Sequence, residues 1–376
     1  MEKKRILFIA HDALAYGANQ SLMNIISVLR DNNIYVKVLF PRKGIICDIF
    51  DKKGWDYSII RYRNELRPAV TNLKSRIKIF RSFCYKKYVN TLAKREISAL
   101  IKRENINIIH SNSGVLSIGV EIANKLNIKH IWHLREFIHP NYGLYLFTHL
   151  GDYKRKIQGS TNLLCVSNKV AEEFDITDKA TVIYDAIRKN MKYSTSQLKE
   201  DYFLFCGSLH KNKGIEEAIM AIKTISLQHH EVKLLIVGEG TSEYERYLRN
   251  LINELGLNEN IYFLGFRTDI DELMAKAKAL LMCSRNEALG RVTAEAMLNY
   301  CLVLGFDDGG TSELIKDGKT GLLYNSIEKL VTLMIEVIEN TNQFNQIVNN
   351  AADFARSNFL ERAFGLSLIK YYDSLK

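Results

Sequence analysis

Short apolar runs alternate with stretches of helical periodicity along the chain. An apolar run of about four to six residues predicts a buried strand, and apolar residues spaced three and four apart predict an amphipathic helix. In the first half, strands are predicted at residues 5–10, 35–40, 106–110, 131–134 and 163–166, and helices at about 20–30, 115–126 and 169–174. This βαβ order predicts a mostly parallel sheet that is covered by helices on both faces.

A second βαβ series follows the polar segment 190–201, which we interpret as a linker. Strands are predicted at 202–206, 232–237, 261–263, 280–283 and 302–305, and helices at 215–226, 243–255, 270–277 and finally about 356–375. A chain of 376 residues is long for a single core, so we predict an α/β fold of two doubly wound domains. The predicted domains are 1–189 and 202–355, and the C-terminal helix 356–376 is expected to pack back on the first domain.

A strand, a polar turn and a helix succeed one another in residues 282–305, MCSRNEALGRVTAEAMLNYCLVLG. Glu287 lies in the turn and Glu295 in the helix, eight positions apart, which corresponds to roughly 12 Å along a helix. That separation is too long for two carboxylates acting on one glycosidic bond, which stand roughly 5 to 9.5 Å apart. It suits two carboxylates that bind the hydroxyl groups at both ends of a long ligand whose anionic middle lies at the helix N-terminus. A nucleotide sugar has this form; the alternative is two unrelated carboxylates, one of them favoured by the helix dipole.

Other candidate residues lie in loops that follow predicted strands or, for His133, near the end of one, where ligands bind in open parallel sheets. Gly17 precedes a helix and could admit a phosphate or sugar close to the backbone, although taken alone the pattern favours a plain turn glycine. His133 could hydrogen-bond a sugar hydroxyl, or it could be a strand-end histidine that is satisfied by the backbone. Lys213 could neutralise a diphosphate without a metal.

The net positive charge of the chain, +10, is accounted for by residues 61–103, which contain thirteen basic and two acidic residues. Aromatic and aliphatic residues alternate with the basic ones, as in an amphipathic helix. Such a helix can lie on an anionic membrane or bind a polyanion, and the alternative is a solvated face packed on the domain. No nucleic-acid recognition motif accompanies the charge, so nucleic acid is not predicted. The residues that we single out as a membrane or acceptor surface are Arg76, Lys78, Arg81, Lys86 and Lys87.

The cellular compartment follows from what the sequence lacks. No apolar run approaches the roughly 18 residues of a membrane span, and the N-terminal residues enter a strand without a signal-peptide pattern. The six cysteines lack metal-ligand spacing and are interpreted as reduced thiols. These features predict a cytoplasmic protein, with peripheral contact to the inner face of the cell membrane left open.

Four segments between Phe205 and Tyr324 carry a family resemblance: FCGSLHKNKGIEEAI, LLIVGEG, IYFLGF and SRNEALGRVTAEAMLNYCLVLGFDDGGTSELIKDGKTGLLY. In order and spacing they resemble family 4 of the retaining glycosyltransferases, which have the GT-B architecture of two Rossmann-like domains facing across a cleft. In the first domain only Gly17 and His133 match the family pattern.

The resemblance implies a role for each candidate residue. Glu295 would hold the ribose hydroxyls, and Glu287 would contact the donor sugar near the reacting centre. Lys213 would bind the phosphates, His133 would contact the sugar, and Gly17 would leave room for donor or acceptor. The backbone facing the sugar and diphosphate would be that of Leu289, Gly290, Arg291 and Val292. The family's front-face mechanism, in which the leaving phosphate takes the acceptor proton, needs no second carboxylate.

Three positions depart from the family pattern. Ser208 stands where the family usually has an arginine, so that Lys211 or Arg291 would have to replace its charge. Ala288-Leu289 replaces an aromatic residue or proline, and Asn19 replaces a frequent glutamate. No D-x-D motif of the metal-dependent transferases is present, so neither a metal nor any cofactor beyond the nucleotide-diphosphate sugar is expected.

The sequence therefore predicts a retaining, metal-independent hexosyltransferase. It would move a hexosyl or amino-hexosyl group from a nucleotide-diphosphate sugar to a glycan or lipid-linked acceptor in bacterial envelope polysaccharide synthesis. Two alternatives remain open: a GT-B type nucleotide-sugar epimerase, and a non-catalytic partner subunit that binds nucleotide sugar.

Overall fold

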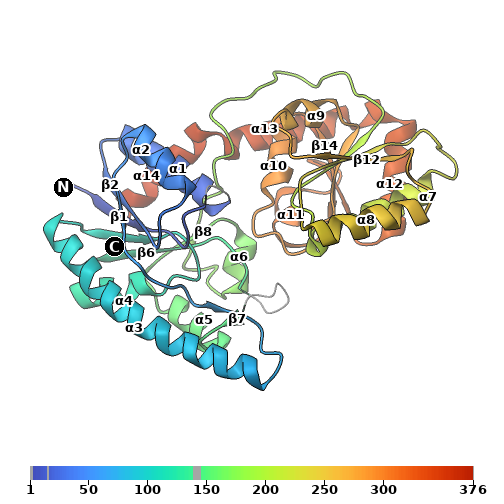
Figure 1. Ribbon diagram of the computed structural model, residues 1–376. Coiled ribbons are helices and arrows are strands. Elements are labelled where there is room, and N and C mark those ends of the chain that lie inside the picture. The colour runs from blue at the N-terminus through green and yellow to red at the C-terminus, as the bar shows by residue number, and fades with distance from the viewer. Residues whose placement is uncertain (1–2, 15–16, 139–144, 376) are drawn as a thin grey trace. The chain divides into compact units, whose positions relative to one another are not determined.

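The computed structural model describes residues 3–14, 17–138 and 145–375 (Figure 1). The chain divides into two compact units, and each is described by itself. Unit 1 consists of Met1–Ala186 and Phe364–Lys376, and unit 2 of Ile187–Ala363. Within the described residues, no helix combines the length and the apolar character that a membrane crossing requires.

A seven-stranded parallel sheet forms the centre of unit 1, with the strand order β3-β2-β1-β5-β6-β8-β9. Its strands are β1 Arg5–Ile9, β2 Tyr35–Phe40, β3 Tyr57–Ile59, β5 Ile108–Ser111, β6 Lys129–Leu134, β8 Asn162–Cys165 and β9 Thr181–Val182. A separate antiparallel pair joins β4 Leu66–Arg67 to β7 Tyr145–Leu146. Because β1, β5 and β6 are neighbours, the loops that follow these strands come together at one edge of the sheet.

Helices cover both faces of this sheet because alternate residues of β1 point to opposite sides. Ile6 and Phe8 face one core, and Leu7 and Ile9 face the other. The helices of unit 1 are α1 Ala18–Asp31, α2 Ile45–Lys53, α3 Leu73–Arg103, α4 Ile118–Leu126, α5 Leu150–Gln158, α6 Asn168–Glu173 and α14 Glu361–Asp373. Helix α14 buries Phe364, Leu368, Tyr371 and Tyr372 in the core that contains α1 and α2, so the last helix completes the first unit (Figure 1).

Unit 2 is built on a six-stranded parallel sheet with the order β12-β11-β10-β13-β14-β15. Its strands are β10 Phe203–Cys206, β11 Leu234–Val237, β12 Ile261–Gly265, β13 Ala279–Met282, β14 Leu302–Phe306 and β15 Leu322–Tyr324. Its helices are α7 Ile215–Ile225, α8 Ser242–Glu254, α9 Ile270–Lys276, α10 Arg291–Leu298, α11 Gly309–Leu314, α12 Ile327–Glu339 and α13 Asn345–Phe359. The central strands β10 and β13 are adjacent, which brings the loops after them together.

The final helix predicted at 356–375 is in fact two helices. Helix α13 ends at Phe359 and α14 begins at Glu361, with Leu360 in an extended conformation between them. Arg188 is responsible for part of this break, because its carbonyl accepts a hydrogen bond from the Glu361 backbone N–H at 3.0 Å. A partner from another part of the chain cannot be read from local periodicity.

The boundary between the units lies before the segment 190–201. The chain leaves unit 1 between Ala186 and Ile187, and residues 190–201 are attached to unit 2. The Lys199 ammonium donates to the carbonyls of Ala275 and Tyr300, both at 2.8 Å. A polar segment of this composition is therefore held in place by specific contacts with unit 2.

Candidate functional site

The loop after β13 leads into helix α10 through a glycine that a larger residue would not easily replace. Gly290 is the N-cap of α10 and adopts the left-handed conformation, with φ 78°. Its immediate surroundings are the Thr293 hydroxyl and the Thr311 backbone N–H, which lie 3.5 and 3.6 Å from the position of an added Cβ. The first backbone N–H groups of a helix have no partner within it, so this turn presents donors and a partial positive charge.

The turn after β14 holds this loop in position. The Asp308 carboxylate accepts a hydrogen bond from the Asn286 backbone N–H at 2.8 Å, and the Glu287 carbonyl accepts one from Gly310 at 2.5 Å. A Cβ at Gly310 would lie 2.7 Å from the backbone carbon of Leu289. The two turns therefore fit together only because residue 310 lacks a side chain.

Two of the predicted donor-binding residues form an ion pair. Lys213, which ends the short 3-10 turn Lys211–Lys213 after β10, pairs its ammonium with the Glu287 carboxylate. Both side chains are partly exposed, at 33% for Lys213 and 18% for Glu287. Gly214 permits this approach, because an added Cβ would stand 2.3 Å from the Cys283 carbonyl oxygen. An ammonium and a carboxylate arranged in this way can bind phosphate oxygens and sugar hydroxyls.

Glu295 lies four residues beyond Arg291, the first residue of α10, and is half-buried. Burial raises the pKa of its carboxyl group; the charges of Arg291 and Arg188 oppose this shift, and that of Asp271 adds to it. Burial and the charge of Glu295 also raise the pKa of Cys206, at the end of β10, to about 12. The carboxyl group of Glu295 therefore belongs to the same edge of the unit 2 sheet as the loops described above.

The other predicted donor-side positions surround this turn. Leu289 and Gly290 are buried, and Arg291 and Val292 are half-buried in the first turn of α10. Ser208, the departure from the family pattern, is exposed just after β10. Among the residues that the structure describes, no group of three or more histidine, cysteine or acidic side chains could hold a metal ion.

His133 differs from its predicted role as a substrate contact. Its ring is 1% exposed, and Nδ1 lies 3.2 Å from Nε2 of His110 while Nε2 lies 3.2 Å from the Arg135 guanidinium. Burial and the charge of Arg135 hold its pKa well below the ordinary value. His133 is thus a neutral, buried member of a polar network that continues from Arg135 to Asp185. The period-2 pattern of β6 could not show which side of the sheet this residue faces.

A polar cluster that sequence reasoning missed lies at the carboxyl edge of the unit 1 sheet. His11 and Asp12 follow β1, with His11 Nε2 and an Asp12 oxygen 3.2 Å apart. Ser113 follows β5, and its hydroxyl donates to the carboxylate of Glu136, which follows β6. Burial alone would lower the pKa of His11, but the hydrogen bond and charge of Asp12, together with the charge of Glu136, raise it. The sequence feature that could have indicated this cluster is that each of these residues follows closely after an apolar strand.

Gly17 is placed at the start of α1, next to residues 15–16, which lie outside the described part of the chain. Its φ of 49° requires glycine, although an added Cβ would meet no atom within 4 Å. Asn19, a departure from the family pattern, donates to the Asp12 carboxylate and the Leu14 carbonyl, both at 2.7 Å. Its amide therefore fixes the loop that carries His11 and Asp12.

One of the residues predicted for the basic surface of 61–103 is buried. Arg76, Lys78, Arg81 and Lys87 are exposed on α3, as expected. Lys86 is 6% exposed and forms an ion pair with the buried carboxylate of Glu65, so its assignment to the surface was wrong. Its partner precedes α3 in the chain, and charge counting alone could not identify the pair.

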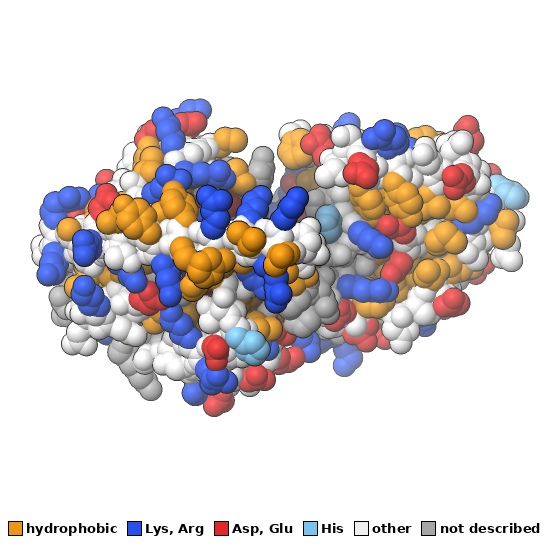
Figure 2. Space-filling model, turned by 60° about the horizontal axis from the view of Figure 1, so that its bottom comes forward, with side chains coloured by type: hydrophobic (Ala, Val, Ile, Leu, Met, Phe, Trp, Pro, Cys, Tyr) orange, Lys and Arg blue, Asp and Glu red, His pale blue; other side chains and the backbone are white. Residues whose placement is uncertain are grey.

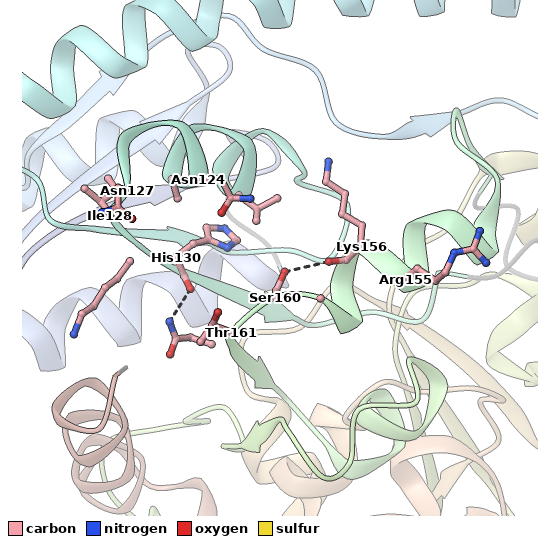
Figure 3. A pocket seen from close by; sticks show the side chains of 13 residues that line it. Asn124, Asn127, Ile128, His130, Arg155, Lys156, Ser160 and Thr161 are labelled. Carbon is pink, nitrogen blue, oxygen red and sulfur yellow. Dashed lines mark hydrogen bonds between the residues drawn. The ribbon is translucent and has the colours of Figure 1, made fainter.

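A separate pocket of about 600 Å³ opens at the amino ends of β6 and β8 (Figure 3). Figure 3 shows His130, Asn124 and Lys156 around it. His130 Nδ1 is buried without a hydrogen-bond partner among the described residues, and Nε2 lies 2.9 Å from the Ser111 hydroxyl. None of the residues predicted from the sequence lines this pocket, which is at the opposite end of the strands from the polar cluster.

The two parallel-sheet units, each with polar loops at the carboxyl edge of its sheet, define the GT-B fold of two Rossmann-like domains. Residues 186–354 match the family model described as Glycosyl transferases group 1. An uncharacterized glycosyltransferase of Methanocaldococcus jannaschii is 27% identical over 339 residues, which cover 86% of this chain and 91% of the relative. The N-acetyl-alpha-D-glucosaminyl L-malate synthase of Bacillus anthracis is 30% identical over 144 residues, 36% of this chain and 37% of that enzyme.

Solved structures agree with the fold over the whole chain. HepE of Anabaena in complex with UDP has a TM-score of 0.79 at 20% identity, with 99% of this chain and 100% of that chain covered. A glycosyltransferase from Rickettsia africae has a TM-score of 0.77 at 19% identity, with 98% of each chain covered. These likenesses establish the fold, and the sequence matches support a glycosyltransferase.

Proposed function

We propose that this protein is a retaining hexosyltransferase that uses a nucleotide-diphosphate sugar. The observation that carries the proposal is the convergence of Lys213, Glu287 and the N-terminus of α10 at one edge of the unit 2 sheet. An ammonium and a helix N-terminus are suited to a diphosphate, and a carboxylate beside them is suited to sugar hydroxyls. The complexes of HepE with UDP and UDP-glucose, on the same fold, support a nucleotide sugar as ligand.

In this proposal each group of the unit 2 site acts on one part of the donor. Lys213 and the backbone from Leu289 to Val292 bind the diphosphate, so no metal is needed to neutralise it. Glu287 holds the donor sugar, and Glu295 accepts hydrogen bonds from the ribose hydroxyls. The N-terminus of α10, which directly follows Gly290, supports this arrangement.

The transfer itself is proposed to occur on one face of the sugar. The bond between the anomeric carbon and the leaving phosphate oxygen breaks, the acceptor oxygen bonds to the same face, and the acceptor proton moves to the leaving phosphate. Glu287 is engaged by Lys213, which supports a binding role for its carboxylate and not that of a nucleophile. Lys213 and the helix N-terminus then stabilise the charge that develops on the phosphate.

Acceptor recognition is proposed for the polar cluster of unit 1, His11, Asp12, Ser113 and Glu136. These groups offer both hydrogen-bond donors and acceptors, as a sugar hydroxyl requires. The acceptor would be a glycan or a lipid-linked glycan of the bacterial envelope. A Campylobacter jejuni transferase named for its undecaprenol-linked acceptor is 30% identical over 165 residues, which supports this class of acceptor.

Thermal shift with a panel of nucleotide sugars, in the presence of a chelator, tests the donor site. A ligand at a hundred times its Kd should raise the free energy of unfolding by about 2.7 kcal/mol, and Glu295→Ala should remove that effect. Glu254→Ala is a matched control, because Glu254 is exposed on α8 away from the site. Equal stabilisation of the wild type and Glu295→Ala would contradict the assignment of this carboxylate.

Turnover is tested separately by following donor consumption with and without glycan acceptors. Transfer in the chelator, with the anomeric configuration of the donor kept in the product by NMR, is the expected result. Epimerised donor would support an epimerase instead, and binding without turnover would support a nucleotide-sugar-binding subunit. Loss of transfer on chelation and recovery with Mg²⁺ would contradict metal independence.

A further inference from the structure

One face of helix α3 carries large apolar side chains that are exposed to solvent. The spacing of four, three, eight and four residues places them along one side of a helix. We call this set the α3 stripe: Leu73 (70% exposed), Ile77 (56%), Phe80 (67%), Tyr88 (63%) and Leu92 (46%). Contiguous apolar surface of this kind marks an interaction site in a folded protein.

The rotation of α3 about its axis is fixed, so the stripe cannot turn inward. The opposite side of the helix buries Ala93, Ile97, Leu100 and Ile101 in the core with β1, and Val89 is buried as well. Lys86 is anchored to Glu65, which also accepts a hydrogen bond from the Ser117 hydroxyl. These contacts hold the second half of α3, while in the first half, residues 73–85, no side chain is buried.

Positive charge surrounds the stripe. Six exposed cations are distributed along it: Lys74, Arg76, Lys78, Arg81, Lys87 and Arg95. In the described residues none of the six takes part in an ion pair, and Glu96 is the one acidic residue within α3. Figure 2 shows apolar and basic side chains intermixed on this side of the molecule. The surface therefore combines apolar area with uncompensated positive charge.

We propose that the α3 stripe lies on the surface of an anionic lipid bilayer. The stripe spans about 30 Å from Leu73 to Leu92, enough for the helix to lie flat with its apolar side chains below the headgroups. The cations on both sides then meet the lipid phosphates. A nucleic acid would use the cations and leave Phe80 and Leu92 in water. A second copy would bring the same positive charge against itself.

This inference goes beyond the proposed transfer reaction and does not depend on it. A bilayer contact would place unit 1 against the membrane whatever the chemistry at the site. Nucleotide-sugar stabilisation in solution should be unaffected by substitutions in the stripe, so failure of one proposal can be distinguished from failure of the other.

The test is co-sedimentation of the full chain with vesicles of phosphatidylcholine alone or mixed with phosphatidylglycerol, at physiological and high salt. We expect binding to the anionic vesicles that weakens at high salt. R76Q/K78Q/R81Q should weaken it by at least about tenfold. The matched control K316Q/K319Q/K329Q removes three exposed cations from unit 2 and should bind like the wild type.

The apolar part of the surface is tested with I77S/F80S, whose residues are exposed, so that thermal melting should not change. Vesicle binding should fall by about tenfold, because each buried apolar group adds to interfacial affinity. A polarity-sensitive dye on the exposed Cys84, which lies between Phe80 and Tyr88, should shift to shorter wavelength on anionic vesicles. Wild-type vesicle binding by I77S/F80S, with equal affinity of both proteins for DNA, would overturn the proposal in favour of a polyanion surface.

Discussion

Two side chains from different loops meet at the proposed donor site. Lys213 and Glu287 are separated by 74 positions, and adjacent parallel strands bring them into an ion pair. Charge alone does not decide whether an ion pair binds a ligand or stabilises the fold, since Lys86 makes a similar pair with Glu65 and has a structural role. The difference lies in exposure: the Lys213 pair is partly accessible, whereas the Lys86 pair is buried.

The free energy of unfolding should depend on pH through histidines that are buried and neutral in the folded protein. Burial, helped by the charge of Lys156, lowers the pKa of His130 from 6.5 to about 3. The unfolded chain takes up a proton near pH 6.5 that the folded protein does not, so the free energy of unfolding falls as the pH drops below 6.5. Between pH 6.5 and 5 the loss from this one group should be about 2 kcal/mol. Urea unfolding at several pH values measures it.

A matched pair of variants distinguishes the effect of His130 on stability from that of other titrating groups. His130→Gln should lose about 2 kcal/mol less than the wild type over that range, whereas His230→Gln, at an exposed position, should follow the wild type. An unchanged pH dependence in His130→Gln would mean that this histidine does not remain neutral in the folded protein.

At the scale of elements, the turn after β14 fixes the loop that precedes α10. Gly310→Ala would place a Cβ 2.7 Å from the Leu289 backbone, so the two turns must separate. We expect a loss of at least about 1 kcal/mol of stability and weaker nucleotide-sugar binding, measured by denaturation and thermal shift. Gly159→Ala is the control, since its φ of −77° suits alanine and the nearest atom is at 3.4 Å. Wild-type donor binding by Gly310→Ala would show that this turn does not shape the site.

At the scale of the whole molecule, the end of the chain belongs to the core of its first unit. Leu368 on α14 is fully buried there with Phe364 and Tyr372. Leu368→Ala should lower the free energy of unfolding by about 2–5 kcal/mol. Leu366→Ala on the same helix should change it by less than about 0.5 kcal/mol, because Leu366 is 69% exposed. Chemical denaturation of both variants checks this, and equal effects would show that α14 does not stabilise unit 1.

The local sequence pattern was sufficient to predict the fold class and the turn and helix on which the candidate site of unit 2 is built. The predicted strands 35–40 and 302–305 correspond to β2 and β14, and the two parallel sheets follow from the βαβ order. Gly290 and the helix after it were also evident, because a turn glycine and helical periodicity are local properties of the sequence. Apolar periodicity decides these features since each element buries its own regular face.

Tertiary structure decided which side chains are accessible to a ligand or a binding surface. His133 is of a residue type expected in a site, and Lys86 of a type expected on a surface. Both are buried, His133 in contact with His110 and Lys86 with Glu65. The cluster of His11 and Glu136 exists only because β1, β5 and β6 are neighbours in the sheet. Arg188 pairs, from far along the chain, with Leu360 at the point where α13 ends. Partners distant in sequence determine these outcomes, and no local pattern contains them.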